Sequence, residues 1–111
     1  MKDGIYHVEF VSTMGAVGDG LVVIQDGSIN GGDGGYLYQG KLEIPAPGLL
    51  RGQLQVRRWN TGRASVFGPL SDFALDLSGQ AANDSFTVSG GVPGHPNMAI
   101  KISGRMLAPV V

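Results

Sequence analysis

The run Gly31-Gly32-Asp33-Gly34-Gly35 places one carboxylate among glycines, a pattern that can cradle a phosphate or supply a calcium ligand. A phosphate cradle opens into a helix whose amides point at the anion, whereas the residues after Gly35 alternate as in a strand. Calcium takes about six to eight oxygen ligands, and no second acid lies within six residues of Asp33. We therefore predict a structural turn here, with no metal and no cofactor.

Catalysis needs a nucleophile, a base and a group that orients the base. The two histidines, His7 and His95, have no histidine or cysteine at metal-ligand spacing. The chain contains no cysteine and no Gly-x-Ser-x-Gly elbow. We expect His7 on an outer face and His95 in a loop. We predict no catalytic, metal or cofactor site, and a protein that is not an enzyme.

The most basic segment holds Arg51, Arg57, Arg58 and Trp59. An aromatic beside arginines is one pattern for binding single-stranded nucleic acid. More often such residues form a solvated outer face with Trp59 stacked under Arg57, and a third option is a protein contact. The net charge is −1, and phosphate contacts dominate nucleic-acid affinity. We therefore expect no direct nucleic-acid binding.

Strands must position these residues, because apolar and polar side chains alternate along most of the chain. The alternation predicts eight strands, at 4–11, 20–25, 28–30, 36–43, 50–59, 72–78, 85–89 and 98–106. Asp26-Gly27 is a strong two-residue hairpin signal. We expect longer connections at 12–19, 60–71, 79–84 and 91–96.

Glycine recurs in the inward phase of these strands, at Gly40, Gly52, Gly90 and Gly104. An inward glycine lets a closing sheet bend sharply. Eight short strands with short links and inward glycines predict an all-β fold, an eight-stranded up-and-down antiparallel β-barrel. The 111 residues form one domain, 1–111. We expect a cytoplasmic protein without a membrane segment, because the sequence has no signal peptide and no run of ~18 apolar residues.

The inward positions form either a packed core or the wall of a cavity that binds a small apolar ligand. A lipocalin-like carrier or sensor is thus an alternative function. The predicted barrel-interior wall consists of Tyr6, Phe10, Tyr36, Tyr38, Leu54, Val56, Phe86, Ile100 and Ile102.

Three apolar residues, Ile5, Leu21 and Val23, fall on the face predicted to be outside. An exposed apolar patch usually marks an interface. We predict a homodimer contact at this patch, and the alternative is that the 60–71 connection folds over it.

Five short segments, in this order, carry a resemblance to a known family: Met1-Lys2-Asp3-Gly4-Ile5-Tyr6, Gly18-Asp19-Gly20, Ile29-Asn30-Gly31-Gly32-Asp33, Tyr38-Gln39-Gly40 and, more loosely, Arg58-Trp59-Asn60. Through them the chain resembles the GrlR family of bacterial regulators. The resemblance implies a lipocalin-like barrel that forms homodimers. It further implies a non-enzymatic regulator that represses type III secretion genes by sequestering a DNA-binding transcriptional activator.

The resemblance also implies roles for particular positions. Asp33 would cap local backbone amides. The residues after the fourth strand would form the partner loop, which here consists of Glu43, Ile44, Pro45, Ala46 and Pro47. The family pattern has a run of acidic residues at this place, and in this chain only Glu43 is acidic.

Overall fold

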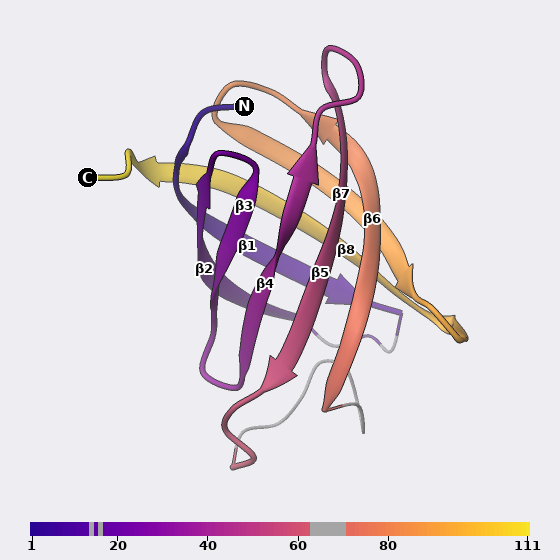
Figure 1. Ribbon diagram of the computed structural model, residues 1–111. Helices are drawn as coiled ribbons and strands as arrows, with labels where there is room; N and C mark the ends of the chain where they lie inside the picture. The colour runs from indigo at the N-terminus through magenta and orange to yellow at the C-terminus, as the bar shows by residue number, and fades with distance from the viewer. Residues whose placement is uncertain (14, 16, 63–70) are drawn as a thin grey trace.

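The computed structural model describes residues 1–13, 15, 17–62 and 71–111, and these residues form a closed barrel (Figure 1). Each strand pairs antiparallel with its neighbour in chain order, and β8 returns to pair with β1. The strands are β1 (Gly4–Ser12), β2 (Val17–Gln25), β3 (Ser28–Gly32), β4 (Tyr36–Glu43), β5 (Leu49–Arg58), β6 (Asp72–Ala81), β7 (Ser85–Val92) and β8 (His95–Ala108). The predicted all-β, eight-stranded up-and-down barrel is confirmed, and a lipocalin-like architecture is consistent with it.

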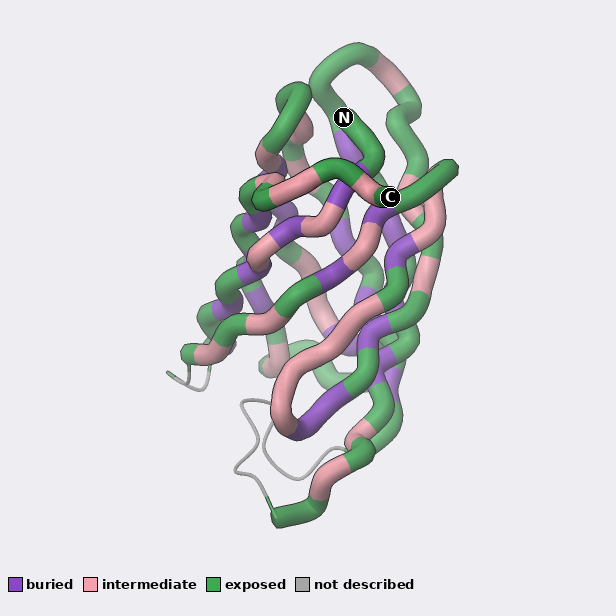
Figure 2. The backbone as a smooth tube through the Cα atoms, turned by 90° about the vertical axis from the view of Figure 1, so that its left-hand side faces the viewer, coloured by how far each residue is buried: buried purple, intermediate pink, exposed green. Residues whose placement is uncertain are grey.

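Burial follows the predicted alternation, so that more buried and more exposed residues succeed one another along most of the strands (Figure 2). In β5, Leu50, Leu54 and Val56 are buried and their neighbours are exposed. Side chains from distant strands meet inside the barrel. The rings of Phe10 and Tyr38, for example, meet edge to face with centroids 5.7 Å apart, a favoured arrangement for aromatic pairs.

Inward glycines lie where the neighbouring strand leaves no room for a Cβ atom. Gly90 pairs with Leu77 on one side and with Ile100 on the other. A Cβ atom at Gly90 would overlap the carbonyl oxygen of Asp76. Gly40 in β4 is in the same position relative to β5, because a Cβ there would overlap the carbonyl oxygen of Gln53. The tight curvature of the barrel therefore depends on residues that have no side chain.

Several predicted boundaries are wrong because strands extend through glycines. The 79–84 stretch is not all turn, since β6 continues to Ala81. The connection at 91–96 is a tight hairpin, with β7 reaching Val92 and β8 starting at His95. His95 therefore begins a strand and does not lie in a loop. Gly94, which has a φ of +83°, makes this reversal possible. Among the described residues, no helix is both long and apolar enough to cross a membrane.

The close approach of strands at Gly90 gives a stability prediction. Gly90→Ala should lower the free energy of unfolding by about 3 kcal/mol, because the new methyl group forces β6 and β7 apart. The neighbouring Gly91→Ala is the matched control, since a Cβ there meets only the Met98 carbonyl oxygen at 3.3 Å. Urea denaturation of both variants tests this, and equal effects of the two substitutions would contradict it.

Candidate functional site

Asp33 organises the loop between β3 and β4. Its Oδ1 atom accepts hydrogen bonds from the backbone N–H groups of Gly35 and Tyr36, both at 2.7 Å. Its Oδ2 atom accepts a hydrogen bond from the Tyr38 hydroxyl. Asp33 thus caps backbone amides, as the resemblance implied. The glycine-rich run is not all turn, because Gly31 and Gly32 belong to β3 and only residues 33–35 connect it to β4.

Two side-chain hydrogen bonds join the residues that follow β5 to this loop. The Trp59 indole Nε1 donates to the carbonyl oxygen of Asp33 at 3.0 Å, and the Asn60 side chain donates to the carbonyl oxygen of Gly34 at 3.0 Å. The expected stacking of Trp59 under Arg57 is not the contact that the structure shows. The cation–π contact is instead between Arg58 and the Tyr36 ring, at 6.0 Å.

The interior of the barrel is filled with side chains. All nine residues predicted to line it are buried. The pocket that the described residues enclose among these core side chains has a volume of about 30 Å³. The hydroxyl groups of two of the buried tyrosines are satisfied by the protein itself. Tyr6 donates to the carbonyl oxygen of Lys2 at 2.6 Å, and Tyr38 donates to Asp33.

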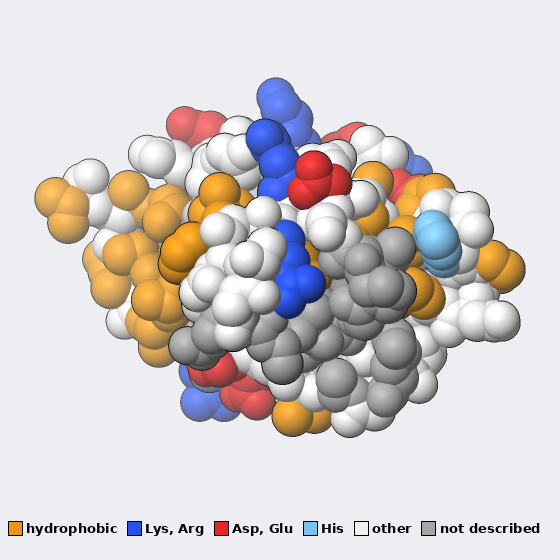
Figure 3. Space-filling model, turned by 90° about the horizontal axis from the view of Figure 1, so that it is seen from below, with side chains coloured by type: hydrophobic (Ala, Val, Ile, Leu, Met, Phe, Trp, Pro, Cys, Tyr) orange, Lys and Arg blue, Asp and Glu red, His pale blue; other side chains and the backbone are white. Residues whose placement is uncertain are grey.

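The predicted dimer patch lies on the outer face of β1 and β2. Ile5 and Val23 are cross-strand partners and half-buried, whereas Leu21 is 51% exposed. Sequence reasoning missed Leu107 of β8, which is 61% exposed close to Ile5. Figure 3 shows hydrophobic side chains gathered on its left, the side where Figure 1 draws β2 and the C-terminal end of β8. The alternative prediction is that the 60–71 connection covers the patch, and residues 63–70 of it lie outside the described residues.

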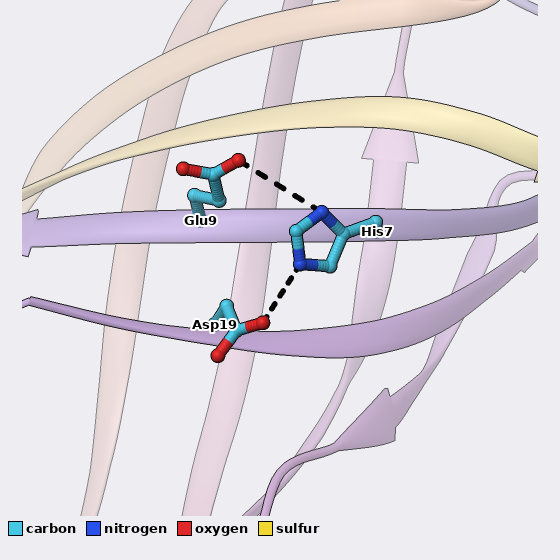
Figure 4. A network of polar contacts seen from close by, with 3 residues as sticks. All are labelled: His7, Glu9 and Asp19. Carbon is cyan, nitrogen blue, oxygen red and sulfur yellow. Dashed lines mark hydrogen bonds and ion pairs between the residues drawn. The ribbon is translucent and has the colours of Figure 1, made fainter.

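His7 lies on the same outer face, between two carboxylates (Figure 4). Its Nε2 atom is 2.8 Å from Asp19 Oδ2, and its Nδ1 atom is 3.9 Å from Glu9 Oε1. Because both ring nitrogens face acids, neither is directed at a nucleophile. Within the described ranges, no group of three or more histidine or acidic side chains is arranged to hold a metal ion.

The predicted partner loop joins β4 to β5 and projects beyond the top of the barrel in Figure 1. Ile44 is 48% exposed, and Pro45 and Pro47 are exposed as well. The one acid, Glu43, pairs with Arg51 across the strands at 3.3 Å. The loop therefore presents an apolar surface, with its only carboxylate already paired.

The full sequence decides which family this barrel represents. Residues 1–110 match the family described as the type III secretion system negative regulator GrlR. The chain belongs to the GrlR family. No curated protein sequence matches the chain.

Membership of the GrlR family identifies the chain with negative regulators of type III secretion. The match extends through the second half of the chain, where the sequence motifs were weakest. For a GrlR-family protein the outer surfaces described above are therefore the candidate functional site, since they are the parts of the barrel that another protein can reach.

The pairing of Tyr38 with Asp33 gives a pH prediction. Burial, followed by the hydrogen bond to Asp33, raises the pKa of Tyr38 above its ordinary value of 10.0. In the unfolded chain the Tyr38 hydroxyl ionises near pH 10, whereas in the folded chain it stays protonated to a higher pH. Its contribution to the free energy of unfolding is therefore complete below about pH 10 and decreases as the pH rises above that value.

Tyr38→Phe should therefore lower the free energy of unfolding by about 2 kcal/mol at neutral pH. The difference in the free energy of unfolding between wild type and variant should become smaller above about pH 10. Urea denaturation followed by the fluorescence of Trp59, the one tryptophan, measures both effects. A difference in the free energy of unfolding that stays constant up to pH 11 would contradict the raised pKa of Tyr38.

Proposed function

We propose that this GrlR-family barrel acts without catalysis, by binding a DNA-binding transcriptional activator and holding it away from its promoters. The family match to negative regulators of type III secretion over residues 1–110 carries the proposal. The proposed site of action is the cytoplasm, because an activator of transcription works there. The net charge of −1 favours protein contact over direct binding to DNA.

The filled interior favours this function over the lipocalin-like alternative. Ligand sites for small molecules usually have volumes of about 300–1,000 Å³. The pocket that the described residues line inside the barrel has a volume of about 30 Å³, which is enough for a water molecule but not for a carried ligand. The proposed function therefore uses the outside of the barrel.

The β4–β5 loop is the proposed partner-facing element. Its backbone is restrained by two prolines and by the hydrogen bond from the Leu49 N–H to the Ala46 carbonyl oxygen, at 3.0 Å. A restrained loop loses little conformational entropy on binding. Ile44 and Leu49, both 48% exposed, give it apolar surface to bury against a partner.

A homodimer is the proposed assembly, formed through Ile5, Leu21 and Val23 together with Leu107. These residues come from three adjacent strands, β1, β2 and β8, so they form one continuous surface. A two-fold contact would bury this surface against its own copy, which is the commonest arrangement in soluble oligomers.

The partner loop is tested by Ile44→Glu. The variant should lose about tenfold or more in affinity for the activator, because a carboxylate would be buried in an apolar contact. The measurement combines repression of a type III secretion reporter with capture of the activator, identified by mass spectrometry. Val17→Glu is the matched control, since Val17 is 70% exposed at the start of β2, far along the barrel from this loop. Equal repression by Ile44→Glu and wild type would reject the β4–β5 loop as the partner-facing element. Capture of no DNA-binding protein would reject the proposed mechanism.

The dimer patch is tested separately by Leu21→Lys. This substitution should shift the chain from dimer to monomer in sedimentation velocity at micromolar concentration, because it places a charge in an apolar contact. Leu49→Lys, equally exposed but on another face, should leave the dimer intact. A wild-type chain that sediments as a monomer would exclude the homodimer.

A further inference from the structure

Met106 lies at the place where the barrel closes. β8 returns alongside β1 there (Figure 1), and the register between the two strands shifts, since Ile5 pairs with Ala108 whereas Tyr6 pairs with Met106. Leu107 is therefore the extra residue of a β-bulge, which interrupts the ladder of backbone hydrogen bonds locally. Side-chain packing is correspondingly important for holding β1 and β8 together at this point.

The thioether of Met106 supplies packing at the bulge. The side chain is half-buried and packs against the hydrophobic core. Its sulfur lies on the backbone of the buried Gly4, because a Cβ atom at Gly4 would be only 2.9 Å from Met106 Sδ and 3.0 Å from Met106 Cγ. The cross-strand partner of Met106, Tyr6, is fully buried. Met106 thus covers the core where the last strand meets the first.

Sulfur is also a chemically reactive element of this chain. The sequence contains four methionines and no cysteine, so thioethers are the only sulfur groups that an oxidant can attack. A hydroperoxide oxidises a thioether by two electrons: its O–O bond breaks, one oxygen forms the S=O bond of the sulfoxide, and the remainder leaves as water or an alcohol. The product is polar and chiral where the thioether was flexible and apolar.

We propose that Met106 is an oxidant-sensitive modification site, and that its conversion to the sulfoxide by a hydroperoxide weakens the pairing of β1 with β8. The half-buried sulfur is open to the oxidant and yet packed against the core. A sulfoxide oxygen held against Gly4 would be removed from water, which costs free energy. A sulfoxide that turned outward would instead leave the core without the packing that covers Gly4. The oxidised chain is therefore less stable, whichever position the sulfoxide takes.

The modification is reversible, because methionine sulfoxide reductases restore the thioether. The barrel would thus respond to oxidant through its own stability, without a cysteine. This inference concerns the closure of the barrel, so it depends neither on the proposed activator nor on the proposed homodimer.

Urea denaturation of the full chain before and after treatment with hydrogen peroxide tests the proposal. Circular dichroism follows unfolding, and peptide mapping by mass spectrometry assigns each sulfoxide to its methionine. The midpoint should fall by about 1 M urea when Met106 is oxidised, the size expected for one polar group placed in an apolar contact. Treatment with the two reductases, one for each sulfoxide epimer, should restore the midpoint.

Met106→Leu removes the sulfur and nearly conserves the side-chain volume, so peroxide should leave the midpoint of this variant unchanged. Met98→Leu is the matched control. Met98 is also half-buried against the core on β8, but it lies near the β7–β8 hairpin, away from the bulge. Met98→Leu should lose as much stability on oxidation as the wild type does.

Three results would overturn the proposal. The first is a wild-type chain that carries Met106 sulfoxide and keeps its midpoint. The second is a loss of stability that persists in Met106→Leu or disappears in Met98→Leu, because the effect then belongs to another residue. The third is a Met106 that stays unmodified while Met98 is oxidised. If Met106→Leu does not fold, the wild type still decides, since its midpoint must fall in proportion to the mapped fraction of Met106 sulfoxide.

Discussion

Closing a sheet of eight short strands into a narrow barrel is the constraint on which the structure depends. The strands must approach so closely that several inward positions have no room for a Cβ atom. Gly40 and Gly90 lie at such positions, against the carbonyl oxygens of Gln53 and Asp76. Large apolar residues occupy the paired positions beside them, such as Leu54 beside Gly40. Alternation of large and absent side chains fills a small barrel without voids.

The filled core decides where function can reside. The interior pocket that the described residues line has a volume of about 30 Å³, which is far smaller than the cavity of a barrel that encloses a ligand. The inward phase of the strands forms the core, so the proposed recognition uses the outward phase and the loops. Two outer regions are chemically distinct: the apolar patch beside His7 on β1 and β2, and the projecting β4–β5 loop.

The sequence predicted those features that depend on local pattern. Period-two alternation identified the eight strands, Asp26-Gly27 identified a hairpin whose two residues both have positive φ, and inward glycines indicated closure. Features that depend on cross-strand register could not be predicted. The Trp59 indole reaches Asp33 across 26 positions, and His7 reaches Asp19 across 12. Strand ends at Ala81 and Val92 were missed because glycine and proline suggest turns wherever they occur, although a barrel uses glycine inside strands.

Asp33 connects the stability of the fold with the shape of its surface. Its carboxylate satisfies two loop amides and the hydroxyl of Tyr38 in the core, while its carbonyl oxygen holds Trp59 outside. One residue thus fixes the β3–β4 loop against the end of β5. Glu43 fixes the opposite end of β4 through its pair with Arg51. Because that carboxylate is engaged within the sheet, the neighbouring loop offers apolar side chains without a competing charge. The recognition proposed for this loop would therefore depend on shape and apolar burial, which depend little on salt, where an acidic run would rely on charge.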